Sequence, residues 1–204
     1  MRSTFYLLLL LLISSHIAYG QSKKYSTHLE GGVLTYGLAT KELGYSFRGV
    51  ESYTISSGFT AGIGVGFEKY MYNEVDEMGF KLLPIFAQVK YILKPETRKS
   101  LFGAFDLGHG VSLNKNEVLD MSKTQYKGGI LASPQIGILF NTKGKKEFFT
   151  FSIGYKYQKF TEDKYFNYGP VLWNSNNPNL KGYDAFMQNK YNMNRISVML
   201  VFGF

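Results

Sequence analysis

Bulky apolar side chains alternate with small or polar side chains along residues 59–70. One face of an extended chain would carry Phe59, Ala61, Ile63, Val65 and Phe67, and the other Thr60, Gly62, Gly64, Gly66 and Glu68. A period of two residues is typical of a β-strand and not of a helix. The segment is therefore predicted to be a strand with one bulky apolar face and one narrow polar face.

The same alternation recurs along the rest of the chain. It predicts eight strands of 12 to 14 residues, at 25–37, 43–55, 59–70, 80–93, 100–113, 127–140, 147–159 and 191–204. The alternation is weak in the first two. Leu34 interrupts the first, and Glu51 falls among the aromatic residues of the second, so a bulge is expected there. Pro134 lacks a backbone donor and predicts a bulge or a local break in the sixth.

The position of the charged residues distinguishes a soluble sandwich, a lipocalin-like barrel and a membrane barrel. The faces made of Gly, Ser and Thr also carry Glu68, Lys90, Asp106, Lys156 and Arg195. Such a face is unsuited to a dry core, whereas an apolar outside and a polar lumen are typical of transmembrane barrels. The segments also exceed the roughly 9–11 residues that a tilted crossing needs. We predict an all-β fold, a single closed antiparallel eight-stranded up-and-down transmembrane barrel.

The connections between these strands alternate in length. Short turns at 56–58, 94–99 and 141–146 alternate with longer loops at 71–79, 114–126 and 160–190, and 38–42 is the exception. This pattern indicates periplasmic turns, extracellular loops and both termini on the periplasmic side. Aromatic girdles are expected at both rims. Their predicted members are Tyr70, Tyr72, Tyr157 and Phe160 at the outer rim and Tyr91, Phe102, Phe148 and Phe204 at the inner rim.

The amino terminus has the features of a signal peptide. Arg2 precedes an apolar run at 5–13, and Ala18 and Gly20 are small residues at the expected cleavage site. A transmembrane helix is the competing interpretation, but it needs about 20 apolar residues. We expect residues 1–20 to be removed and residues 21–204 to form one barrel domain.

Composition narrows the possible chemistry. The chain has no cysteine, which excludes disulfides, thiol catalysis and a lipid-anchored cysteine. Without Arg2 it has 22 basic and 15 acidic side chains. The lysines are scattered and the chain is expected to be exported, so attraction to anionic lipid headgroups explains this balance better than nucleic acid binding.

No residue pattern predicts catalysis or a cofactor. Successive residues of a strand point to opposite faces, so Asp106 and His109 cannot form an acid–base pair. His28 has no evident partner in the sequence, and three histidines without cysteine make a poor metal site. The glycines at 62, 64 and 66 do not form a phosphate-binding loop, because Phe67 stands where a further glycine is required. We expect no enzyme activity, cofactor or metal.

Five segments carry the alternation most clearly: GIGVGFEKY (62–70), LPIFAQVKYIL (83–93), LFGAFDLGHGV (101–111), KGGILASPQIGILF (127–140) and FSIGYKYQKF (151–160). In succession they resemble the outer-membrane β-barrel proteins common in Bacteroidota, which are similar to the OmpA and OmpX type of small barrel. The end of the chain, with Leu200, Phe202 and Phe204, is similar to the signal read by the outer-membrane assembly machinery. The resemblance implies location in the cell outer membrane. It also implies contacts with outer-membrane lipid and lipopolysaccharide, with the assembly machinery and with periplasmic chaperones.

Three functions remain as hypotheses. The interior of an eight-stranded barrel is only wide enough for side chains, so the inward charges are expected to pair and to fill it. The first hypothesis is therefore a monomeric, non-enzymatic barrel whose loop 160–190 contacts an unknown extracellular ligand, a protein or lipopolysaccharide. Its candidate contact residues are Tyr165, Tyr168, Trp173 and Tyr183. A narrow porin-like channel is the second hypothesis, and an outer-membrane lipid hydrolase or acyltransferase is the third.

Overall fold

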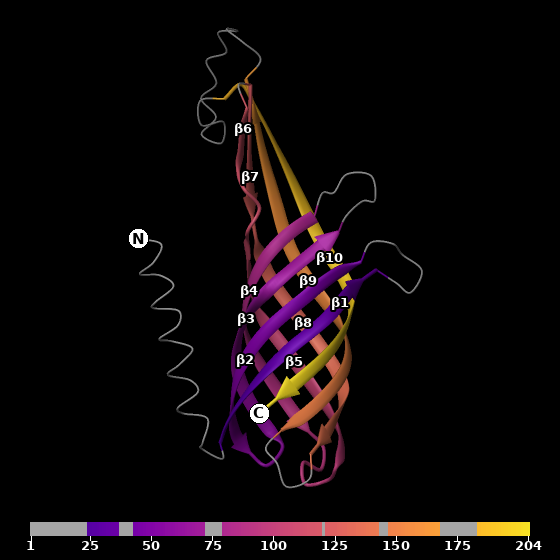
Figure 1. Cartoon of the computed structure of the whole chain (residues 1–204). Helices are drawn as coiled ribbons and strands as arrows, with labels where there is room; N and C mark the ends of the chain where they lie inside the picture. Colours follow the sequence, from indigo (N-terminus) through magenta and orange to yellow (C-terminus); the bar gives the residue numbers. More distant parts are fainter. Residues whose placement is uncertain (1–23, 37–42, 72–78, 120, 143–146, 168–182) are drawn as a thin grey trace.

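The computed structural model describes residues 24–36, 43–71, 79–119, 121–142, 147–167 and 183–204 (Figure 1). The predicted signal peptide, residues 1–20, lies outside these ranges. Within them, no helix has the length and apolarity needed to cross a membrane.

Every regular element in the described ranges is a β-strand. The strands are β1 Tyr25–Thr35, β2 Gly44–Ser56, β3 Phe59–Met71, β4 Gly79–Ile92, β5 Lys99–Ser112, β6 Glu117–Leu119, β7 Ser122–Lys127, β8 Gly129–Asn141, β9 Phe148–Phe166 and β10 Ala185–Gly203. Antiparallel pairing follows the order β1-β2-β3-β4-β5-β8-β9-β10, and β10 pairs back onto β1. Within this sheet the eight barrel strands form a closed ring without an open edge, as predicted.

β7 and β8 form one barrel strand with a bulge between them. Lys127 pairs with Thr161 of β9, whereas Leu131 pairs with Gln158, so the register shifts by one residue around Gly128. β6 forms a short hairpin with β7. The prediction of a loop at 114–126 was therefore wrong. The alternating residues of β7 are all polar or tyrosine, which leaves no hydropathy contrast to detect.

β9 and β10 are each 19 residues long and, together with β6 and β7, reach beyond the other barrel strands (Figure 1). Their pairing continues from Phe148 opposite Gly203 to Phe166 opposite Ala185. The predicted loop 160–190 is thus wrong in its limits, because only residues 167–184 connect the two strands. We call β6, β7, residues 160–166 and residues 185–191 the extension.

The two faces of the barrel strands are as predicted. Outward side chains such as Ile63, Ile136 and Leu101 are 72%, 68% and 59% exposed, while the polar residues between them are buried. The alternation in β2 is unbroken, since β2 and β3 stay in register from Tyr45 to Thr54. No bulge occurs at Glu51. That side chain lies on the outer face near the short-turn end of β2, where it accepts a hydrogen bond from Thr27 (Oγ1 to Oε2, 2.6 Å).

Each of the two strand prolines interrupts one ladder. Pairing between β8 and β9 is absent at Ser133 and Pro134 and resumes at Gln135 in the same register. Pairing between β3 and β4 is likewise absent at Leu83 and Pro84. A proline has no N–H to donate, and the expected local break at Pro134 is confirmed.

Four of the predicted girdle residues lie inside the barrel. Tyr70 and Phe160 are 0% exposed, Phe102 is 4% exposed, and Phe148 faces the lumen beside the buried His28. All four belong to the inward-facing positions of their strands, so the strand period, and not the aromatic character, determines their position. Tyr91 and Phe204 are exposed at the short-turn end, as predicted, and Tyr72 is outside the described residues.

Candidate functional site

The lumen is closed at the loop end by a cluster of apolar side chains, which we call the outer plug. It consists of Leu34, Tyr70, Phe80, Leu82, Phe160 and Met193. The rings of Phe80 and Phe160 lie 4.2 Å apart, and Tyr191 packs against both of them. The outer plug explains why Leu34 interrupts the polar face of β1.

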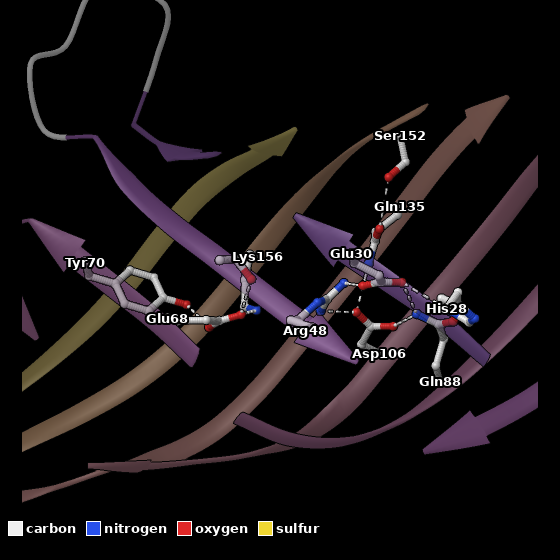
Figure 2. Close-up of polar contacts among 11 residues, drawn as sticks. His28, Glu30, Arg48, Glu68, Tyr70, Gln88, Asp106, Gln135, Ser152 and Lys156 are labelled. Carbon is white, nitrogen blue, oxygen red and sulfur yellow. Dashed lines mark hydrogen bonds and ion pairs between the residues drawn. The ribbon is translucent and has the colours of Figure 1, made fainter. Parts of the chain in front are cut away.

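Below the outer plug, a guanidinium joins two carboxylates in the middle of the lumen (Figure 2). Arg48 of β2 donates to Asp106 of β5 (Nη1 to Oδ2, 2.7 Å) and forms an ion pair with Glu30 of β1. These three side chains are at most 3% exposed. Burial of a charge is costly unless the charge is paired, and each of these charges is paired.

Amides complete this group, which we call the central network. Gln88 donates to Asp106 (Nε2 to Oδ1, 2.9 Å), and Gln135 donates to the other oxygen of Asp106 (Nε2 to Oδ2, 2.8 Å). Ser152 in turn donates to Gln135 (Oγ to Oε1, 3.2 Å). Both oxygens of Asp106 are therefore satisfied without water.

A second ion pair crosses the lumen between Glu68 of β3 and Lys156 of β9 (Figure 2). These strands are four apart in the ring of eight, so the pair joins opposite walls. Tyr70 donates to Glu68 (OH to Oε2, 2.8 Å), and so does Ser46 (Oγ to Oε1, 2.9 Å). We call this group the transverse pair. It links the polar lumen to the outer plug through Tyr70.

Two of the predicted lumen charges have no carboxylate partner within 4.0 Å among the described residues. Lys90 is 6% exposed, and its ammonium lies 5.2 Å from the centre of the Phe102 ring. Arg195 stacks on Tyr36, with Cζ 3.2 Å from the ring centre, and donates to the Met71 carbonyl (Nη2 to O, 3.2 Å). Of the five predicted lumen charges, Glu68 and Lys156 contact each other, whereas Asp106 contacts Arg48.

Arg48 and Glu30 were not predicted to belong to the central network. The period of β2 was uncertain because of Glu51, so Arg48 was not assigned to a face. Its spacing of two from Ser46 and four from Ser52 was the available signal, since all three are buried.

The described candidate contact residues lie at the base of the 167–184 connection. Tyr165 is 3% exposed and packs against Tyr183 (5.3 Å between ring centres) and Phe186 (5.1 Å), so it supports the extension and is not itself open to a partner. Tyr183 is half-buried. Tyr168 and Trp173 lie outside the described residues.

Hydrogen-bonded carboxylates are the main polar feature of the extension. Asp163 accepts from Lys127 (Nζ to Oδ2, 2.6 Å) and Gln188 (Nε2 to Oδ1, 2.8 Å), and Glu162 accepts from Asn189 (Nδ2 to Oε2, 2.9 Å). The hydrogen bond to Asp163 raises the pKa of Lys127 above its usual value. These contacts hold β7, β9 and β10 together beyond the barrel.

The two described histidines lie apart, on opposite faces of the barrel wall. His109 is on the exposed outer face, and Asp106 is buried on the opposite face. His28 Nε2 lies 3.3 Å from Glu30 Oε1, a contact that the sequence did not indicate. In the ranges that the structure describes, no cluster of three or more His, Cys, Asp or Glu residues is suited to a metal.

A cavity of about 300 Å³ occupies the short-turn end of the lumen. Its walls come from the ends of the strands, and they include Ser26, Thr54, Thr60 and Phe148. Lys90 and His28 also line it. The central network and the outer plug separate this cavity from the loop end.

Comparison with known proteins identifies the fold. No family model and no curated protein matches the chain. Among solved structures, outer membrane protein OprG from Pseudomonas aeruginosa is similar, with a TM-score of 0.57 and 7% identity over 89% of this chain and 96% of that one. The chain has the fold of a small outer-membrane β-barrel.

Two further structures are similar over most of their length. Outer membrane protein AlkL, solved in DMPC lipid bilayers, has a TM-score of 0.50 and 12% identity over 90% of each chain. Neisserial surface protein A has a TM-score of 0.48 and 13% identity over 88% of this chain and 96% of that chain. Together with the apolar outer surface, the fold agrees with location in the outer membrane.

Proposed function

We propose that this protein is a non-enzymatic, monomeric outer-membrane barrel whose lumen is closed by its own side chains. The observation that supports the proposal most strongly is the transverse pair, which joins opposite walls of the barrel immediately below the outer plug. An ion path needs continuous water, whereas Glu68, Tyr70 and Lys156 are each at most 2% exposed.

Single-channel recording in a planar bilayer tests this proposal against the narrow-channel alternative. The refolded barrel should insert without unitary current steps, and a known porin recorded in the same bilayer controls for detection. Reproducible unitary steps that disappear when the protein is omitted would establish the channel alternative instead.

We further propose that the extension presents the 167–184 connection to an extracellular ligand, a protein or lipopolysaccharide. β9 and β10 hold the ends of this connection with ladder pairing up to Phe166 and Ala185. A variant in which a short Gly-Ser linker replaces residues 168–182 should still assemble, since both paired strands are kept. Surface crosslinking on whole cells should then lose partners that the full chain captures. An unchanged set of partners would refute this role.

The non-enzymatic part of the proposal also has a direct test. Outer-membrane lipid profiles should be the same after deletion and after overexpression of the protein. A lipid species that changes in opposite directions in the two strains would support the hydrolase or acyltransferase alternative.

A further inference from the structure

The cavity at the short-turn end contains a buried cation without a counter-ion contact. Lys90 lines it and is 6% exposed, and no described carboxylate lies within 4.0 Å of its ammonium. An ammonium has three donors and no acceptor, so a partner for it must supply acceptor oxygens. The N–H donors of the Lys90 ammonium therefore face the cavity without a carboxylate acceptor among the described residues.

The acidic groups nearest in the lumen are occupied by other donors. Glu30 pairs with Arg48, and Asp106 accepts from Arg48, Gln88 and Gln135. Lys90 therefore acts on the negative charges of Glu30 and Asp106 only through long-range attraction. If that attraction were its whole role, Lys90 would be a structural residue and the cavity would need no ligand.

The rest of the cavity wall points to a ligand with two chemically different ends. Hydroxyl groups of Ser26, Thr54 and Thr60 lie on the wall with Lys90, and apolar surface comes from Ile92 and Phe148. His28 is 1% exposed; its Nδ1 makes no hydrogen bond within the described chain, and its Nε2 lies 3.3 Å from Glu30 Oε1. Hydroxyls and an ammonium suit an anionic group, while the aromatic and aliphatic surface suits a compact apolar body.

We propose that this cavity binds a small organic carboxylate from the periplasmic side, with the carboxylate on Lys90 and the apolar body against Phe148 and Ile92. The size of the cavity, about 300 Å³, is at the lower end of the range for small-molecule sites. The ligand would not cross the barrel, because the central network closes the inner end of the cavity. The site is independent of the surface role proposed for the extension.

Lysine-resolved NMR on the full mature barrel in octyl glucoside tests this proposal. The lysines are labelled by reductive ¹³C-methylation. Hexanoate is then titrated into one sample, and 1-hexanol, its uncharged counterpart, is titrated into another. The Lys90 resonance should shift saturably with hexanoate and stay unchanged with hexanol. Lys90→Met should weaken hexanoate binding, measured by calorimetry, by about tenfold or more, because a charged hydrogen bond is lost.

Two variants control for nonspecific charge and for misfolding. Lys99→Met removes an exposed lysine of β5 near the same end of the barrel and should leave binding unchanged. Thr54→Phe keeps Lys90 and adds bulk to the cavity wall, so it should also weaken binding by about tenfold or more and serves if Lys90→Met does not fold. No saturable Lys90 shift, or equal binding by hexanoate and inorganic phosphate, would overturn the proposal.

Discussion

Arg48 is the residue on which the central network depends most. It is the cation in direct contact with both Glu30 and Asp106, and all three are buried. Removal of one partner of a buried ion pair leaves an uncompensated charge, which costs far more than an exposed pair contributes.

Arg48→Met should therefore lower the free energy of unfolding by about 3–5 kcal/mol. The measurement is urea unfolding in detergent, followed by the gel-mobility difference between folded and unfolded barrel. Lys99→Met, on the exposed face of β5, is the matched control and should change stability little. A loss as small as that of the control would show that the central network is hydrated or rearranged.

Glycine makes room for side chains inside the barrel at Gly64. A methyl group there would lie 2.7 Å and 2.9 Å from Cε2 and Cε1 of Phe86, and closer still to its Cζ. Phe86 is 2% exposed, and the Arg48 guanidinium covers its ring at 4.7 Å, so it has little freedom to move.

Gly64→Ala should destabilise the barrel by about 1–3 kcal/mol through overpacking. Gly31→Ala is the comparison, because a methyl group on Gly31 meets nothing within 4 Å. Equal urea midpoints for the two variants would mean that Phe86 moves aside without loss of stability, which would contradict the prediction.

For single residues, the sequence predicted which face of a strand a side chain occupies better than it predicted which side chain it contacts. Period-two alternation assigned Glu68, Asp106 and Lys156 to the polar face because the period is a local property. Pairing across the lumen depends on the order and stagger of strands far apart in sequence. That is why the contact between Asp106 and Arg48, 58 residues apart, was not predicted.

The strands of the extension were the elements predicted least well from the sequence. A strand inside a bilayer needs an apolar face toward lipid, so its apolar and polar residues alternate and the pattern can be recognised. β7 carries polar residues or tyrosine on both faces, so it shows no such contrast. Hydrogen bonds such as that from Lys127 to Asp163 hold the extension together, and Tyr165 packs on Phe186 beside them.

Lys127→Met should lower the free energy of unfolding by less than about 1 kcal/mol near neutral pH, because the Lys127 side chain is 56% exposed. The pKa of Lys127 is raised in the folded state, so its contribution is complete below the unfolded pKa and is lost as pH rises through the folded pKa. Wild type and variant should thus converge in stability only at strongly alkaline pH. Urea unfolding of both proteins at neutral and alkaline pH measures this, and a large difference at neutral pH would contradict it.

The whole molecule combines an apolar outside with an inside filled in layers. From the loop end these layers are the outer plug, the transverse pair, the central network and the cavity around Lys90. A ring of eight strands brings opposite walls close enough for side chains to meet, and here they do. The barrel is thereby stabilised from within as well as by its closed ladder.

A single-cysteine accessibility scan in lipid vesicles tests this account most directly, since the chain has no native cysteine. Spin labels on cysteines at Ile63 and Val65 should be accessible to oxygen and protected from a water-soluble nickel reagent. Unlabelled cysteines at the buried lumen positions Ser133 and Ser197, close in size to the serines they replace, should not react with a water-soluble thiol reagent, because the lumen is closed. Rapid reaction at 133 and 197 would reveal an open pore, and nickel access at 63 and 65 would show that the apolar face does not contact lipid.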